Sequence, residues 1–91
     1  IGLKKFLAQN TVYPKTALEN NEQGTVIVQF VVNSIGKTEK FEVVNSNEHS
    51  IYLEAEAIRV INATSYIWNP ATVNGFPVNM RYRIPVMFQI F

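Results

Sequence analysis

The longest alternation of apolar and polar residues lies at the C-terminal end of the chain. The even positions of residues 78–90 are all apolar, and they are Val78, Met80, Tyr82, Ile84, Val86, Phe88 and Ile90. A period of two over this length predicts a long β-strand with one buried face. Pro85 interrupts the segment, and because proline has no N–H to donate to a neighbouring strand, it indicates that this strand lies at an edge of its sheet.

Two shorter segments predict a β-hairpin. Residues 23–33 alternate in the same way, with large apolar residues at Val26, Val28, Phe30 and Val32. Residues 34–37 have turn chemistry, since Gly36 can adopt a positive φ. The return strand is expected over residues 38–46, where Val44 indicates either a bulge or an end that is covered on both sides.

Helical spacing of apolar residues predicts the remaining elements. Two short helices are expected within residues 1–21, the second beginning after Pro14, which suits the first turn of a helix. A longer helix is expected over residues 51–63, with Ser50 as its N-cap. The connection at residues 73–77 has the composition of a turn.

The order of these elements predicts an α+β fold. The hairpin makes the first two strands antiparallel, and the long helix then leads to the third strand. The simplest arrangement is a two-layer structure with a three-stranded antiparallel sheet in the order 2-1-3 and helices packed on one face. We expect residues 1–91 to form a single domain, since the length is ordinary for one.

Composition excludes several classes of protein. The chain is 47% hydrophobic and 16% charged, which is too apolar and too weakly charged for disorder. The net charge of +1 argues against a nucleic-acid binder that acts by counterion release and against a polybasic membrane patch. Cysteine is absent, which excludes disulfides and cysteine-based sites. We expect neither a membrane-spanning helix nor a signal peptide in this sequence.

Candidate catalytic chemistry is sparse. His49 is the only histidine and lies in a polar loop, so we expect it to be exposed rather than a catalytic base. One histidine, with no cysteine or aspartate, argues against a metal site. Glu54 and Glu56 are two positions apart on a helix and point in different directions, so both are expected to be solvated charges near its start. The sequence therefore predicts no catalytic, metal or cofactor site, and a protein that is not an enzyme.

The predicted edge strand is the main candidate for function. Arg81 and Arg83 should face away from the core while Tyr82 faces into it, and Trp68 should pack over the end of the sheet. An open edge can accept an extended peptide as an additional strand. It can equally pair with a second copy of the chain, or be protected by Pro85 and the arginines. The residues themselves leave these alternatives open.

Several short motifs occur in a fixed order along the chain. They are Leu-Lys-Lys-Phe-Leu at 3–7, Tyr-Pro-Lys-Thr-Ala at 13–17, Gly-Thr-Val-Ile-Val-Gln-Phe at 24–30, Val-Val-Asn-Ser at 43–46, Trp-Asn-Pro-Ala at 68–71, Asn-Gly-Phe-Pro-Val at 74–78 and Tyr-Arg-Ile-Pro-Val-Met-Phe at 82–88. Together they resemble the C-terminal domain of TonB, the energy transducer of Gram-negative envelopes, in the variant common in Bacteroidetes. The resemblance covers nearly the whole chain.

The resemblance implies a function and a location. It implies a non-enzymatic periplasmic domain without cofactors, at the end of a longer protein that is held in the inner membrane by an N-terminal helix. Family members bind the TonB box of outer-membrane transporters by pairing it with the last strand, and they transmit force from inner-membrane motor proteins during siderophore or nutrient uptake. If the last strand binds a partner in this way, the residues expected to flank or touch it are Asn79, Arg81, Arg83, Met87, Gln89, Asn10 and Thr11.

A second interpretation keeps the fold and changes the role. Similar domains also occur in sensor-type membrane proteins. There the domain would be an interaction or dimerisation module, and a possible homodimer would form by pairing the edge strand with its own copy. An enzyme that depends on His49 is the remaining, less favoured hypothesis.

Overall fold

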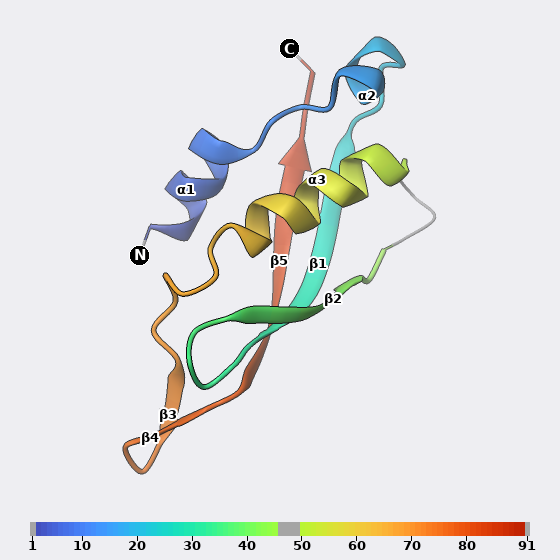
Figure 1. Ribbon diagram of the computed structural model, residues 1–91. Helices are drawn as coiled ribbons and strands as arrows, with labels where there is room; N and C mark the ends of the chain where they lie inside the picture. Colours follow the sequence, from blue (N-terminus) through green and yellow to red (C-terminus); the bar gives the residue numbers. More distant parts are fainter. Residues whose placement is uncertain (1, 46–49, 91) are drawn as a thin grey trace.

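The computed structural model describes residues 2–45 and 50–90 of the chain. Figure 1 shows the elements in order along the sequence. They are α1 (Leu3–Asn10), α2 (Lys15–Glu19), β1 (Gly24–Val32), β2 (Thr38–Val43), α3 (Ile51–Asn62), β3 (Ala71–Val73), β4 (Phe76–Val78) and β5 (Met80–Phe88).

The main sheet confirms the predicted α+β fold. Its three strands have the order β2-β1-β5, and both pairings are antiparallel. Helix α3 lies across one face of this sheet, and α1 and α2 contact α3 (Figure 1). The even positions of β1 are buried under α3 as the alternation predicts, with Phe30 fully buried.

Three local predictions around this core are also confirmed. Ser50 is the N-cap of α3, and its side chain accepts a hydrogen bond from the Leu53 N–H at 3.3 Å. Trp68 and Tyr82 pack together and against Phe30, with ring centroids 4.9–6.0 Å apart. Both side chains pack against the core, and the Trp68 Nε1–H donates to Thr64 Oγ1 at 2.7 Å, just after the C-terminal end of α3.

The irregularity of β2 is not where the sequence indicated. The register shifts between Gln29 and Val31, opposite Lys40, which has a φ of 56°. A residue in this left-handed region inserts one extra position and bends the strand. Of the two alternatives predicted for Val44, the bulge is wrong, because Val44 lies just beyond the end of β2, where its N–H donates to the carbonyl of Ile27. The strand does end here, but Val44 is exposed and so is not covered on both sides.

Asn45 continues the hydrogen bonding of β2 beyond its last residue. Its side-chain Oδ1 accepts from the Ile27 N–H at 3.0 Å, and its Nδ2 donates to the Thr25 carbonyl at 2.8 Å. An amide group has the same donor and acceptor as a peptide group, so this side chain takes the place of the missing strand. The Ile27 N–H and the Thr25 carbonyl of β1 are therefore hydrogen-bonded here, although β2 itself has ended.

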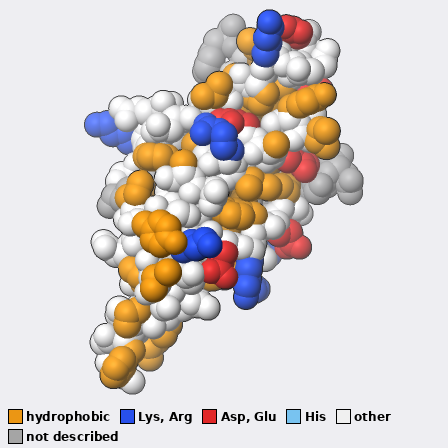
Figure 2. All heavy atoms as spheres, in the orientation of Figure 1, with side chains coloured by type: hydrophobic (Ala, Val, Ile, Leu, Met, Phe, Trp, Pro, Cys, Tyr) orange, Lys and Arg blue, Asp and Glu red, His pale blue; other side chains and the backbone are white. Residues whose placement is uncertain are grey.

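Residues 71–78 form a hairpin that the sequence analysis treated only as a turn. Strands β3 and β4 pair with each other, and Asn74 and Gly75 have the positive φ angles of a tight hairpin turn. Val78 belongs to this hairpin, so the last strand of the main sheet is Met80–Phe88 and not residues 78–90. The hairpin forms one end of the molecule, where Figure 2 shows apolar side chains at the surface.

Candidate functional site

Strand β5 is an open edge of the main sheet. Within the described residues it pairs only with β1. The backbone N–H and C=O of Ile27 both point towards β2, where they bond to Asn45 and Val44. Because backbone groups alternate in direction along an antiparallel strand, Pro85, the partner of Ile27 on β5, points its backbone away from β1.

This alternation identifies the free backbone groups of the edge. Arg81, Arg83, Pro85 and Met87 lie opposite odd-numbered residues of β1, so their N–H and C=O groups face outward. Pro85 has no N–H, and the edge therefore offers three donors and four acceptors. The absence of this N–H removes no hydrogen bond between β5 and β1, because the nitrogen of Pro85 faces away from β1. The edge position that the sequence predicted from Pro85 is confirmed.

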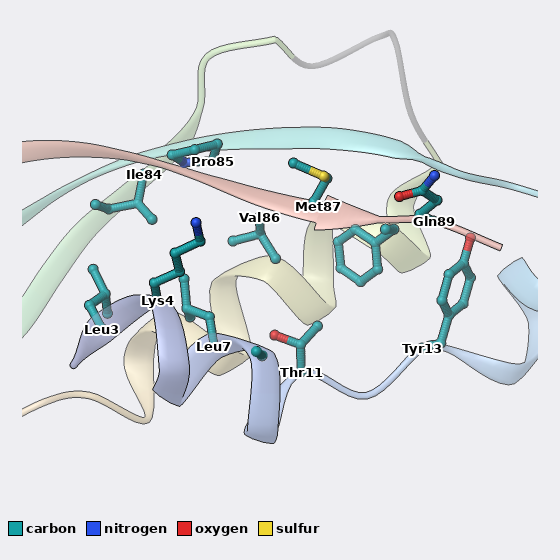
Figure 3. A pocket seen from close by; sticks show the side chains of 12 residues that line it. Leu3, Lys4, Leu7, Thr11, Tyr13, Ile84, Pro85, Val86, Met87 and Gln89 are labelled. Carbon is teal, nitrogen blue, oxygen red and sulfur yellow. The ribbon is translucent and has the colours of Figure 1, made fainter. Parts of the chain in front are cut away.

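An apolar groove of about 830 Å³ runs beside this edge, between α1 and β5. Figure 3 shows Leu3, Leu7 and Thr11 on the α1 side of the groove, with Ile84 and Val86 pointing towards them from β5. Pro85 and Met87 point to the opposite side of the strand. The open backbone edge and a surface for apolar side chains thus lie next to each other.

A charged pair holds the segment that follows α1 against α3. Glu56 accepts hydrogen bonds from the Val12 N–H at 2.7 Å and from Arg59 at 2.6 and 2.7 Å, and Arg59 also donates to the Asn10 carbonyl at 2.9 Å. Glu56 is only 9% exposed, so the prediction that it is a solvated charge is wrong. Its position in the second turn of α3 turns its side chain towards residues 10–12, which the sequence pattern of α3 alone does not reveal.

The pair changes the ionisation of both partners. Burial opposes the charged form of Glu56, but the hydrogen bonds from Arg59 and Val12 and the charge of Arg59 outweigh it, so the pKa of Glu56 is lowered. The same hydrogen bond raises the pKa of Arg59. Both side chains therefore stay charged near neutral pH, and they hold the end of α1 against α3.

Tyr13 lies at the other end of the groove. Its ring packs edge-on against Phe88 with centroids 5.6 Å apart, and its hydroxyl donates to the carbonyl of Glu22. Burial and the nearby charge of Glu22 raise the pKa of Tyr13, so the hydroxyl remains a donor. The tyrosine of the Tyr-Pro motif thus connects the segment between α1 and α2 to the end of β5.

The structure brings some of the predicted site residues together. Thr11, Met87 and Gln89 line the groove, and Met87 is 70% exposed. Arg81 and Arg83 lie further along the same strand, both exposed on the face opposite α3. These five residues surround one continuous edge.

The other two predicted residues are already engaged in the fold. The Asn79 side chain accepts from the Ser34 N–H at 3.1 Å, at the end of the edge away from the groove. The Asn10 side chain donates to the Phe6 carbonyl, and its own carbonyl is held by Arg59. Asn79 therefore lies just before β5, and Asn10 lies at the end of α1, outside the residues that line the groove.

Sequence reasoning missed the apolar wall of the site. Leu3, Leu7, Ile84, Val86 and Phe88 were assigned only to the core or to helix packing, yet they line the groove. A signal was present, because Leu3 and Leu7 repeat at helical spacing on a helix that buries none of its residues completely. An amphipathic helix that is only half covered has apolar surface left for another contact.

The described residues contain no cluster of three or more histidine, cysteine or acidic side chains that could hold a metal. His49 and Ser46 lie outside the described residues. In the part of the chain that the structure covers, no helix has the length and hydropathy of a membrane span.

The fold and the site define a class of protein: a small two-layer α+β domain that presents an open sheet edge beside an apolar groove. Residues 9–90 match the model of the Gram-negative bacterial TonB protein C-terminal family. The chain belongs to this family. It is thus a domain of the TonB energy-transducer type, a non-enzymatic interaction domain, and the family implies a periplasmic location, an inner-membrane anchor and interaction with outer-membrane transporters.

Two solved structures are similar to the fold, and both are of the TonB C-terminal domain of Helicobacter pylori. The structure of residues 179–285 has a TM-score of 0.75 and 23% identity, with 98% of this chain and 78% of that one covered. That of residues 194–285 has a TM-score of 0.73 and 22% identity, with 96% and 88% covered. No curated protein sequence matches the chain.

Proposed function

We propose that the domain binds the TonB box of outer-membrane transporters by strand addition to β5. The observation that carries this proposal is the row of outward N–H groups at Arg81, Arg83 and Met87, which lies beside an apolar groove. In strand addition, backbone hydrogen bonds supply affinity and side chains at alternate positions supply selectivity. Both requirements are met along the same nine-residue strand.

Each predicted partner-binding residue has a place in this proposal. Arg81 and Arg83 flank the added strand on the face opposite α3, and Met87 does so near the groove. Gln89 and Thr11 lie where the partner leaves the groove. Asn79 lies just before β5 and Asn10 at the end of α1, and the hydrogen bonds that both already make leave them less to offer a partner.

The proposal includes the transmission of force. All nine residues of β5 are paired with β1, and β1 lies in the centre of the sheet under α3. A pull on a strand added to β5 is therefore shared among several hydrogen bonds that lie side by side. In the full-length protein, the N-terminal part would tether the domain to the inner membrane and receive this force from the motor proteins.

Proline substitution at an outward position tests strand addition. Arg83→Pro removes one outward donor without removing a hydrogen bond to β1, and Pro85 shows that β5 accommodates proline at an equivalent position. We expect Arg83→Pro to weaken binding of a TonB-box peptide about tenfold. The matched variant Arg83→Ala keeps the N–H and should lose less. Calorimetric titration gives the affinities, and circular dichroism shows whether each variant is folded.

Unchanged affinity in a folded Arg83→Pro variant would contradict strand addition at this edge. An open edge also fits the second candidate, an interaction module of a sensor-type membrane protein that pairs β5 with its own copy. Sedimentation over a range of concentrations separates the two candidates. A permanent dimer that takes up no peptide would favour self-pairing, whereas a monomer that binds peptide favours the transducer.

A further inference from the structure

The β3–β4 hairpin has an apolar face that is open to solvent. Ala71 pairs with Val78, and Val73 pairs with Phe76. Residues directly opposite each other on antiparallel strands point to the same face, so these four side chains share one face of the hairpin. Phe76 is 73% exposed and Val73 is 57% exposed, and neither belongs to the core. Exposed apolar surface of this kind marks a contact with another surface.

Further exposed apolar side chains lie at the same end of the molecule. The turn between β1 and β2 lies next to the base of the hairpin, because the Asn79 side chain accepts from the Ser34 N–H at 3.1 Å. The Tyr66 N–H donates to the Gly36 carbonyl at 2.7 Å, which brings the segment after α3 to the same turn. Half of the large apolar side chains that are exposed among the described residues lie in these segments, in the hairpin or at the start of β5: Ile35, Tyr66, Ile67, Val73, Phe76 and Met80.

The charges near this end favour an anionic partner. The hairpin contains no charged residue, and no acidic residue follows Glu56 in the sequence. Lys37 in the turn and Arg81 just after the hairpin are exposed, and neither takes part in an ion pair among the described residues. Glu39 follows the same turn, and its Oε1 is bonded to Asn33 Nδ2 at 2.6 Å. On the face that Figure 2 shows, the hairpin has apolar side chains and no charged ones.

The shape of this end suits a membrane surface better than a second protein. The molecule is elongated, with extents of 49 × 25 × 14 Å, and the hairpin projects at one end (Figure 1). An end face of 25 × 14 Å covers about 350 Å², whereas a stable protein interface buries ~800 Å² per partner. An apolar face can instead enter the boundary between lipid headgroups and acyl chains, where it has no fixed shape to match.

We propose that the β3–β4 hairpin is a membrane-contact site that inserts its apolar face into the surface of an anionic phospholipid bilayer. Val73 and Phe76 enter the boundary between headgroups and acyl chains, and the charges of Lys37 and Arg81 attract the headgroups. The two strands bond to each other, so the inserted backbone keeps its hydrogen bonds. Because few side chains insert, the contact is weak and reversible, as it is for a single acyl chain. This site is separate from the peptide-binding edge and goes beyond the proposed function.

Sedimentation with vesicles of phosphatidylethanolamine and phosphatidylglycerol tests the inference. The fraction of the chain that is bound at each lipid concentration gives a partition coefficient. Phe76→Ser should lower this coefficient about five- to twentyfold, and Val73→Ser should lower it in the same direction. Ile51→Ser is the matched control, since Ile51 is 74% exposed at the start of α3, away from the hairpin, and it should leave the coefficient unchanged. Circular dichroism shows whether each variant is folded.

Two further measurements locate the contact. A phospholipid that carries a nitroxide on its acyl chain should broaden the NMR signals of the Val73, Gly75 and Phe76 amides most strongly. Lys37→Glu should weaken binding to the anionic vesicles about fivefold or more, and it should affect binding to vesicles of phosphatidylcholine much less.

Several results would overturn the inference. They are no binding of the wild type to the anionic vesicles, an equal loss in Phe76→Ser and Ile51→Ser, unchanged binding of Lys37→Glu, or broadening centred outside the hairpin. A second copy of the chain is the alternative occupant of the apolar face. Hairpin amide shifts that change with protein concentration in the absence of lipid, and that no longer change in Phe76→Ser, would assign the face to self-association instead. None of these results bears on strand addition at β5, which Arg83→Pro tests.

Discussion

Glu56 shows how a single buried charge can position a surface helix. Helix α1 is short and has no fully buried residue, so its own packing holds it weakly. The carboxylate of Glu56 adds hydrogen bonds to Val12 and Arg59, and Arg59 reaches the last residue of α1. These contacts hold the end of α1 against α3, and α1 forms one side of the groove beside β5.

Glu56→Gln should therefore lower the free energy of unfolding by about 1–3 kcal/mol, because the amide cannot accept from both donors as an ionised carboxylate does. Urea denaturation at neutral pH measures this loss. Glu19→Gln is a matched control, because it removes the charge of an exposed glutamate whose Oε1 lies 4.0 Å from Lys15 Nζ. It should cost less than about 0.5 kcal/mol.

The effect of Glu56→Gln should depend on pH. Folding lowers the pKa of Glu56. Its ionised form therefore stabilises the protein fully at pH values above the pKa that Glu56 has in the unfolded chain. That stabilisation is lost as the pH falls through the folded pKa. The difference in unfolding free energy between the wild type and Glu56→Gln should shrink over this acidic range. A difference that stays constant as the pH falls would contradict the role of the charge.

At the scale of elements, the sequence predicted the helices and strands whose apolar residues repeat along one buried face. The period of two in β1 and β5 and the apolar stripe of α3 each follow from burial against the same core. The β3–β4 hairpin was missed because its three-residue strands are too short for a period and are mostly exposed. The bulge at Lys40 was missed because lysine gives no sign of a positive φ.

Of the candidate site, the sequence predicted the open edge but not the groove beside it. Pro85 is a local signal of an edge, so the open strand could be inferred from the sequence. The groove depends on how α1 lies beside β5, and this is set by contacts between residues more than 40 positions apart, such as Val12 and Glu56. A pattern within one element contains no information on such a distance. Residues that line the groove therefore looked like ordinary core residues.

Asn45 offers a test of how the part of β1 that β2 leaves uncovered is hydrogen-bonded. Asn45→Ala leaves the Ile27 N–H and the Thr25 carbonyl without their bonds to this side chain, so we expect a loss of about 1–3 kcal/mol in unfolding free energy. Asn45→Asp keeps the acceptor for Ile27 and removes the donor to Thr25.

Hydrogen exchange is the local measurement for this prediction. The Ile27 amide should exchange faster in Asn45→Ala than in Asn45→Asp, and slowest in the wild type. An Ile27 amide that stays equally protected in a folded Asn45→Ala variant would show that the side chain does not substitute for the missing strand.

At the scale of the whole molecule, the fold separates a rigid core from a binding edge. The core lies between α3 and the sheet. Where β2 leaves β1 uncovered, Asn45 bonds to the Ile27 N–H and the Thr25 carbonyl. Strand β5 is an edge strand with outward donors, and an apolar groove lies beside it. An added strand would therefore extend an existing sheet without rearranging it, which suits a domain that must bind and bear a load.

Amide hydrogen exchange of β5, with and without a TonB-box peptide, tests this account most directly. The amides of Tyr82, Ile84 and Val86 face β1 and should be protected in both states. Those of Arg81, Arg83 and Met87 face outward and should become protected only when the peptide is bound. Outward amides that remain unprotected at saturating peptide, or new protection confined to β2, would contradict strand addition at this edge.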